Sequence, residues 1–172
     1  MTVVREDFYD DSFHAAYILE LTPTHHLGHY WIPSSLGSFV LDLGCEKLVN
    51  NLQLINSRNQ FLGNDRATKD FEFSSSLRKD DGWEVVIASQ LPDRRRDNEP
   101  TAMDWYYFPP VNMRFVKFEV KSFHRPGRGG GLKYINFNNV PGKIKYPVTK
   151  KMIFSIIKVC LPSKLKDLKI LP

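Results

Sequence analysis

Residues 38–44 read SFVLDLG, and apolar side chains alternate along this stretch. In an extended chain Phe39, Leu41 and Leu43 would share one face, with Asp42 on the other. A period of two residues is typical of a β-strand that lays one face on a core. Asp42 is a charged group inside an apolar stretch, so we expect it to be paired or hydrogen-bonded after folding.

Six further stretches carry the same alternating, β-branched or aromatic residues: NLQLIN at 51–56, DFEFSSS at 70–76, WEVVIA at 83–88, DWYYF at 104–108, RFVKFEV at 114–120 and LKYINF at 132–137. Their lengths and spacing are typical of a sandwich or barrel. No long helical pattern lies between them, which argues against a parallel sheet with crossover helices. The sequence therefore predicts an all-β fold, an antiparallel sandwich.

Turn residues separate these stretches. Asp80-Asp81-Gly82 predicts a hairpin turn, because glycine tolerates the positive φ that such turns need. Pro109-Pro110 predicts a break between two strands, since neither proline can donate to a ladder. The run Gly129–Gly131 predicts a sharp backbone path that a Cβ would block. Residues 1–37 show no sustained period and are interpreted as loop with one short strand, Ala16–Leu21.

The end of the chain differs in kind from the rest. Residues 141–172 hold eight lysines and one acid, Asp167, a net charge of +7, so an overall charge of +5 leaves residues 1–140 at −2. A nucleic-acid argument from charge would concern this segment only, and no nucleic-acid partner is expected. We divide the chain into a sandwich domain, residues 1–140, and a basic extension, residues 141–172, that could be an edge strand, a short helix or a disordered tail.

The termini, the apolar runs and the cysteines bear on compartment and redox state. The acidic N-terminus lacks the apolar region of a signal peptide, and no apolar run is long enough to span a bilayer. The chain has two cysteines, Cys45 and Cys160. One disulfide is compatible with them, but two independent buried thiols are the preferred interpretation.

Taken in order, SFVLDLG, the strand ending in Asn56, NDRATKDFEFSSS, DDGWEVV, RFVKFEV and GGGLKYINF resemble the discoidin family, also called the coagulation-factor type C family. The resemblance covers roughly residues 28–138. It implies a galactose-binding-like jelly roll of about eight antiparallel strands, with ligands bound by loops at one end. The chain departs from the family in lacking cysteines at the two ends of the domain and in carrying residues 141–172.

Several residues are expected to serve this fold. Trp83, directly after the hairpin turn, should bury a large area in the core. Asp65, Arg66, Lys69 and Asp70 have the composition of a polar clamp at the base of a loop, a structural role preferred for Lys69 and Asp70.

The main candidate for ligand binding is a set of loop residues with aromatic, basic and amide side chains. A sugar needs an aromatic face for its C–H patch and fixed donors and acceptors for its hydroxyls. The candidates are His26, His29, Tyr30, Trp31, Arg58, Asn59 and Arg66. Their alternative role is to satisfy backbone groups of their own loops.

The same set is similar to the fucose-binding motif of the F-type lectins, which share the fold. His29, Arg58 and Arg66 occur in the order of that motif. Gln60 stands where the motif has an acid, and the spacing of the two arginines is one residue longer. The resemblance therefore implies a lectin-like site with a degenerate motif.

Other candidates have simpler alternatives. Arg94, Arg95 and Arg96 could bind an anion, but the neighbouring acids favour a self-paired, solvated loop. The stretch 123–128, FHRPGR, is loop-borne and either functional or a long hairpin connection.

Metal and enzyme chemistry have less support. The histidines at 25, 26 and 29 have no nearby cysteine or carboxylate to complete a zinc site. Related jelly rolls often hold a structural calcium near the first long loop, which could be bound here by backbone carbonyls. Sequence motifs of hydrolases, metalloproteases and P-loop enzymes are absent, so no enzyme is predicted.

We therefore expect a non-enzymatic module that binds a glycan or glycoprotein through end loops, as in lectins of cell adhesion. One alternative is a protein-interaction module in a larger assembly. Another is peripheral phospholipid binding, with apolar contacts from Leu27, Tyr30, Trp31, Phe61 and Leu62 aided by the lysines of 141–172. The family resemblance favours an extracellular setting, whereas the missing signal peptide favours an intracellular one.

Overall fold

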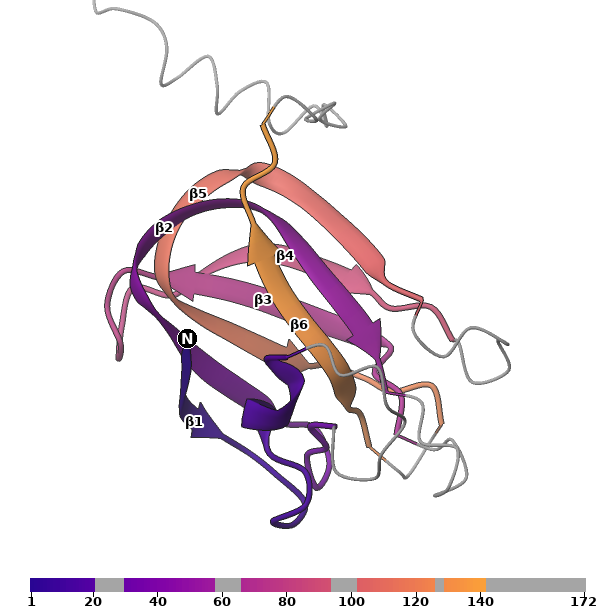
Figure 1. Ribbon diagram of the computed structural model, residues 1–172. Coiled ribbons are helices and arrows are strands. Elements are labelled where there is room, and N and C mark those ends of the chain that lie inside the picture. The colour runs from indigo at the N-terminus through magenta and orange to yellow at the C-terminus, as the bar shows by residue number, and fades with distance from the viewer. Residues whose placement is uncertain (21–29, 58–65, 94–101, 126–128, 142–172) are drawn as a thin grey trace, which may run out of the picture.

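The computed structural model describes residues 1–20, 30–57, 66–93, 102–125 and 129–141 (Figure 1). Its elements are β1 (Thr2–Glu6), the 3-10 helix η1 (Ala15–Ile18), β2 (Ser38–Asn56), β3 (Asp70–Ser76), β4 (Glu84–Gln90), β5 (Asp104–Val120) and β6 (Leu132–Asn138). Within this part of the chain, no helix is long and apolar enough to cross a membrane.

Two long strands, β2 and β5, each contribute to both layers of a sandwich. The first half of β2 pairs with β1 on one side and with the second half of β5 on the other. The second half of β5 also pairs with β3, and β3 pairs with β4. The second half of β2 pairs with β6 and with the first half of β5. All pairs are antiparallel, so the described strands form a layer of five strand segments and a layer of three. The prediction of an antiparallel jelly roll is confirmed, and its eight segments come from six described strands because β2 and β5 each contribute to both layers.

The bends of β2 and β5 lie where their ladder is interrupted. In β2, Gly44 has φ +86° and lies between the paired residues Asp42 and Lys47. In β5, Tyr107 pairs with Asn51 and Val111 pairs with Val49, which leaves Pro109-Pro110 outside the ladder. The predicted break at the two prolines is therefore a local gap in pairing, not the end of a strand, because the backbone stays extended through it.

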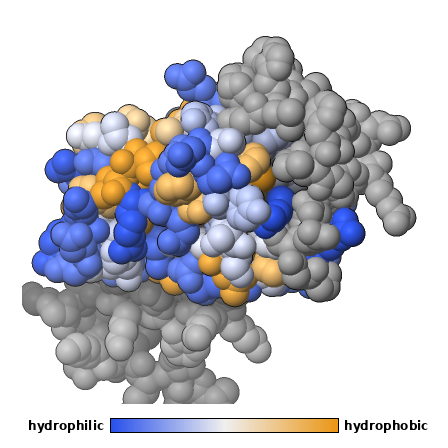
Figure 2. All heavy atoms as spheres, turned by 90° about the horizontal axis from the view of Figure 1, so that it is seen from below, coloured by the Kyte–Doolittle hydropathy of each residue, from blue (hydrophilic) through white to orange (hydrophobic). Residues whose placement is uncertain are grey.

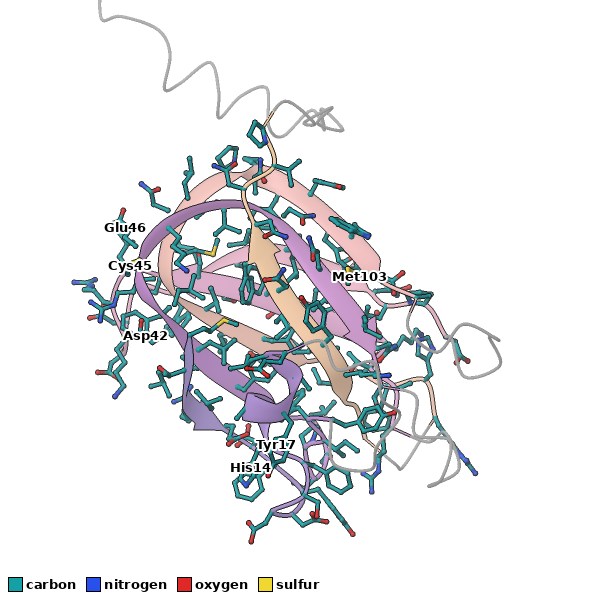
Figure 3. The ribbon with its side chains drawn as sticks, in the orientation of Figure 1. His14, Tyr17, Asp42, Cys45, Glu46 and Met103 are labelled. Carbon is teal, nitrogen blue, oxygen red and sulfur yellow. The ribbon has the colours of Figure 1, made fainter. Side chains whose placement is uncertain are left out.

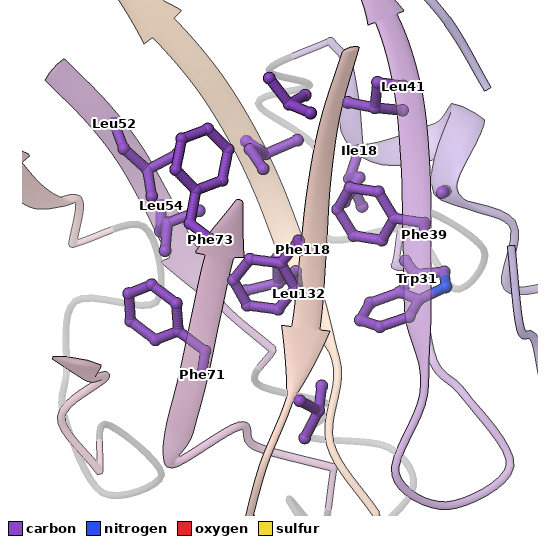
Figure 4. Packing of buried hydrophobic residues seen from close by; sticks show 14 of the residues in the cluster. Ile18, Trp31, Phe39, Leu41, Leu52, Leu54, Phe71, Phe73, Phe118 and Leu132 are labelled. Carbon is purple, nitrogen blue, oxygen red and sulfur yellow. The ribbon is translucent and has the colours of Figure 1, made fainter. Parts of the chain in front are cut away.

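The core lies between the two layers (Figure 4). Phe39, Leu41 and Leu43 point into it, as their alternation predicts. Phe118 stacks on Phe39 and on Phe71, with ring centroids 5.6 and 5.2 Å apart. Across the layers, Phe73 of β3 stacks on Phe137 of β6 at 5.5 Å.

The tryptophan of the core is Trp31, and the expectation for Trp83 is wrong. Trp31 has no exposed surface, meets Phe39 edge-on at 4.7 Å, and donates a hydrogen bond from Nε1 to the carbonyl of Asp7 at 2.8 Å. Trp83 is only half-buried. The reason is topological, because Trp83 directly precedes β4, which pairs only with β3 at the edge of its layer. A side chain at this edge reaches the rim of the core but not its centre.

The first 20 residues also differ from expectation. The predicted strand Ala16–Leu21 is wrong, because Ala15–Ile18 form a 3-10 helix whose Ala15 and Ile18 enter the core. Glu6 fixes this helix: its Oε2 accepts a hydrogen bond from the Ala15 N–H at 2.6 Å, and its Oε1 lies 2.8 Å from His14 Nδ1. β1 is a short edge strand with a register shift, which explains why it shows no sustained period.

Cys45 lies at the bend of β2, on the same side as Asp42 and Glu46 (Figure 3). Its thiol is free and the residue is exposed, so the expectation that Cys45 is buried is wrong. The second cysteine, Cys160, and the whole segment 142–172 lie outside the described residues.

Candidate functional site at the loop end of the sandwich

Four stretches that contain or adjoin most candidate residues, 21–29, 58–65, 94–101 and 126–128, lie outside the described residues, but the residues that flank them meet at one end of the sandwich. A Cβ on Gly131 would lie 2.9 Å from the carbonyl oxygen of Trp31, 3.0 Å from that of Arg66 and 3.1 Å from Ser57 Cβ. Trp31 and Leu132 exchange backbone hydrogen bonds of 2.9 Å. We call this region the loop end.

Asn56, the last residue of β2, joins three of the flanking segments. Its Oδ1 accepts hydrogen bonds from the N–H groups of Ser57 at 2.9 Å and Thr68 at 3.0 Å. Its Nδ2 donates to the carbonyls of Thr68 at 2.8 Å and Pro92 at 3.3 Å. Because Asn56 is almost fully buried, water cannot reach its side chain. The amide of Asn56 therefore supplies the hydrogen bonds that these backbone N–H and carbonyl groups need.

The glycine run packs against Thr68. The Thr68 hydroxyl donates to the Gly131 carbonyl at 2.9 Å and accepts from the Gly131 N–H at 3.0 Å. A Cβ on Gly130 would lie 2.8 Å from Thr68 Oγ1 and 2.8 Å from Val120 Cγ1, and Gly129 has φ +100°. The predicted need for glycine on this path is confirmed.

Asp70 forms the structural clamp expected of it. Its carboxylate accepts hydrogen bonds from the Ser122 hydroxyl and from Gln90 Nε2, the latter at 2.6 Å. The Ser122 bond, more than any other contact, lowers the pKa of Asp70 below its ordinary value. Lys69 contributes through its backbone, donating to the Ser122 carbonyl at 2.9 Å, while its side chain is exposed. His124 lies nearby, with Nε2 2.9 Å from the Leu91 carbonyl oxygen.

Arg66 is the candidate ligand residue that the structure places at the rim of the loop end. Its guanidinium lies over the ring of Tyr9, 5.0 Å from the centroid, and the residue is half-buried. A Cβ on Gly129 would lie 3.1 Å from its Nη1. Tyr9, which is not among the candidates predicted from the sequence, is 55% exposed. Its ring is an exposed aromatic surface beside this guanidinium.

The structure removes Trp31 and Tyr30 from the list of exposed aromatic platforms. Trp31 is completely buried, and Tyr30, 6% exposed, packs with Phe13 and Ile32 in a small second cluster. Trp31 is held inward by its backbone pairing with Leu132, and Tyr30 is held inward by its packing against Phe13 and Ile32. The same burial excludes them as apolar contacts to a membrane in this conformation.

The remaining candidates lie outside the described residues: His26, His29, Arg58, Asn59, Arg94, Arg95 and Arg96, and with them His25, Leu27, Gln60, Phe61, Leu62 and Asp65. Their assignments stay predictions. The same holds for a calcium ion near the first long loop. In the part of the chain that is described, no three His, Cys, Asp or Glu side chains gather as a metal site would require.

Two buried polar atoms at the loop end have no hydrogen-bond partner among the described residues: Ser57 Oγ and Lys133 Nζ. Burial lowers the pKa of Lys133, since removal from water disfavours the ammonium. Neither residue is among the candidates that the sequence indicates. A lysine inside the apolar run LKYINF was the available signal for Lys133.

An open pocket of about 340 Å³ lies elsewhere, beside the β3–β4 hairpin, where its lining includes Ser76, Arg78, Glu84 and Asn112. Gly82 of the turn Asp80–Gly82 also lines this pocket. The hairpin predicted at this turn is confirmed, and Gly82 has φ +69°.

Seen from below, the described surface is mostly hydrophilic, with apolar areas set between polar side chains (Figure 2).

No family model matches the chain, and no curated protein matches it. Solved structures do. The family 32 carbohydrate-binding module of EndoD from Streptococcus pneumoniae superposes with a TM-score of 0.62 at 15% identity, covering 81% of this chain and 95% of the module. At this identity the likeness shows a shared fold, an antiparallel jelly-roll β-sandwich.

Two further carbohydrate-binding modules share this jelly roll. Chitosan-binding module 1 of a chitosanase/glucanase from Paenibacillus sp. IK-5 has a TM-score of 0.60 at 14% identity, covering 80% of this chain and 92% of that one. The family 32 module of NanJ from Clostridium perfringens, solved with galactose, has a TM-score of 0.57 at 11% identity, covering 79% and 90%. At these identities the likeness establishes the jelly roll, and the ligand must be argued from the site.

Proposed function

We propose that this chain is a non-catalytic module that binds a glycan, free or on a glycoprotein, through the loop end of the sandwich. The observation that carries the proposal is the convergence of the segments flanking 21–29, 58–65, 94–101 and 126–128 on the network of Asn56, Thr68 and Gly131. A rigid base from which several loops depart is the usual arrangement of a binding site on a β-sandwich.

The chemistry at the rim suits a sugar. Arg66 offers several N–H donors in a fixed plane, and the exposed ring of Tyr9 beside it offers an apolar face. Three modules with this jelly roll are named for carbohydrate binding or were solved with galactose. The predicted contributions of His29, Arg58 and Asn59 would add to the same rim.

The test compares two arginines at opposite ends of the sandwich. The full chain and the variants Arg66→Ala and Arg114→Ala are applied to a glycan array, and array hits are followed by NMR titration, with galactose and fucose included. Arg114 is a matched control because it pairs with Asp42 at the bend of β2, away from the loop end. We expect Arg66→Ala to weaken binding at least tenfold, about 1.4 kcal/mol, and Arg114→Ala to leave it unchanged. No array hit, together with no loop-end shifts in either titration, would refute the proposal.

A further inference from the structure

The outer face of the three-stranded layer carries a regular set of neutral side chains. The register places Trp105 of β5, Gln53 of β2 and Asn136 of β6 in one cross-strand row. It places Tyr107, Asn51 and Asn138 in the next row. Because side chains alternate along a strand, all six project from the face opposite to the core residues Leu52 and Leu54.

The two aromatic rings on this face are exposed. Trp105 is 50% exposed and Tyr107 45%, although side chains of this size are usually buried. Their ring centroids are 6.5 Å apart and their planes differ by 16°. This separation matches the distance of about 6.6–6.8 Å between alternate residues of a strand, so the rings project side by side in nearly the same orientation.

Amide side chains that are hydrogen-bonded to one another form the surface beside this aromatic pair. Gln53 Nε2 donates to Asn51 Oδ1 at 3.1 Å, and Asn136 Nδ2 donates to Gln53 Oε1 at 3.3 Å. Asn51 Nδ2 in turn donates to the Tyr106 carbonyl at 3.3 Å. Gln53 and Asn51 are buried, whereas Asn136 and Asn138 are half-exposed and remain available to a ligand.

The opposite layer provides a contrast within the same molecule. On the five-stranded layer, Glu72 of β3, Lys117 and Glu119 of β5, and Lys121 directly after β5 form ion pairs of 2.7–2.9 Å. None of the six residues on the face of the three-stranded layer is charged. A charged face is the ordinary solvated surface of a sheet, so exposed aromatic rings on a neutral, amide-lined face need another explanation.

We propose that this face is a second carbohydrate-binding surface, one that takes a neutral, extended β-linked polysaccharide. Pyranose rings with equatorial hydroxyls present axial C–H groups on their faces, which pack on aromatic rings, and they direct hydroxyls outward to amide partners. Two rings in succession with nearly parallel planes favour consecutive sugars of an extended chain over the terminal sugar of a branched glycan. This surface needs none of the loop-end residues.

The test is affinity electrophoresis of the full chain in native gels containing hydroxyethylcellulose, glycol chitin or laminarin. The variant Trp105→Ala/Tyr107→Ala is compared with Trp105→Phe and with Tyr17→Ala, a control that removes another exposed aromatic ring from η1. We expect at least one polysaccharide to retard the wild-type chain. We expect the affinity of the double variant for that polysaccharide to fall roughly tenfold, which is the scale of removing two stacking rings. Trp105→Phe should keep part of the retardation, and Tyr17→Ala should keep all of it.

The outcomes separate this surface from the loop end. Arg66→Ala should be retarded like the wild-type chain, and the double variant should keep any array hit that Arg66→Ala loses. Chemical unfolding of each variant checks that the fold is intact. The inference is overturned if no polysaccharide retards the wild-type chain, or if the double variant is retarded equally. It is also overturned if ultracentrifugation shows that the rings serve only self-association of the chain.

Discussion

At the residue scale, burial separates side chains that look alike in the sequence. The three tryptophans lie in three environments: Trp31 inside the core, Trp83 at the rim of an edge strand and Trp105 half in solvent. Composition and local pattern cannot rank them, because each stands beside aromatic or β-branched neighbours. Only the place of each tryptophan in the tertiary structure decides its exposure.

The first prediction concerns Trp31. Trp31→Ala should lower the free energy of unfolding by about 3–5 kcal/mol, because it leaves a cavity between Phe39 and Phe118 and removes the hydrogen bond to Asp7. Trp83→Ala should cost less than half as much. Equilibrium denaturation measures both. A Trp31→Ala variant with unchanged stability and lost glycan binding would return Trp31 to the ligand site.

The second prediction concerns the ion pair of Asp42 and Arg114, which lies at the bend of β2 (Figure 3). As the sequence predicts, Asp42 is paired, with Arg114 Nε and Nη2 each 3.3 Å from a carboxylate oxygen. These bonds, and one from the Gly44 N–H, lower the pKa of Asp42. A lowered pKa in the folded state stabilises the fold above the ordinary pKa of the group, and this contribution is lost as the pH falls through the lowered value.

Asp42→Asn should therefore be slightly less stable than the wild-type chain at neutral pH, and the difference should shrink to zero in acid. The effect is small because the pair is partly exposed. Thermal unfolding measured across the acid range tests it, with Glu46→Gln, a neighbouring exposed carboxyl, as the control. A difference that grows as the pH falls would contradict this sign.

At the element scale, the two long strands explain most of the fold. The pattern of 38–44 and 51–56 predicts two strands, and so does that of 104–108 and 114–120. In the structure each pair is a single strand that bends where pairing is interrupted. A bend carries one strand from one layer to the other, and nothing in a local pattern distinguishes it from a turn.

The third prediction belongs to the connection before β6. Gly130→Ala should cost about 1–3 kcal/mol of unfolding free energy, since a Cβ there meets Thr68 and Val120 at 2.8 Å. Its NMR shift changes should cluster at the loop end, around Thr68 and Ser57. Gly44→Ala, where a Cβ has open space but φ is +86°, should be strained as well, with shift changes confined to the bend of β2. Shift changes of Gly130→Ala that spare Thr68 would contradict the packing described.

At the scale of the whole molecule, charge and fold are separate along the chain. Every strand that the structure describes lies within residues 1–141, and Asn50 holds the end of this part through hydrogen bonds of 3.0 and 2.8 Å to the backbone of Val140. Residues 142–172 hold eight lysines and one aspartate. The basic charge therefore lies after the last described strand.

The fourth prediction is that a chain ending at residue 141 keeps the fold and the glycan ligand but changes its charge. Removing +7 from +5 leaves −2, so the truncated chain should no longer bind a cation exchanger or anionic vesicles at pH 7. Its unfolding transition and its glycan-array hits should match those of the full chain. Loss of folding would show that residues 142–172 complete the core. Loss of a stoichiometric partner on truncation would favour the alternative of a protein-interaction module.

The sequence by itself determined the strand content, the antiparallel sandwich, the hairpin at Asp80–Gly82 and the need for glycine at Gly129–Gly131, whereas the jelly-roll arrangement was implied by the family resemblance. These follow from side-chain alternation and backbone sterics, which are local properties. The tertiary structure alone decided which aromatic residues are buried, because burial depends on which strands meet across the two layers. It placed Trp31 inside, left Trp105 and Tyr107 outside, and brought Tyr9 beside Arg66. The loop end could be predicted from the family resemblance and the loop residues, whereas the neutral outer face could not, since its rows join residues of three strands far apart in the chain.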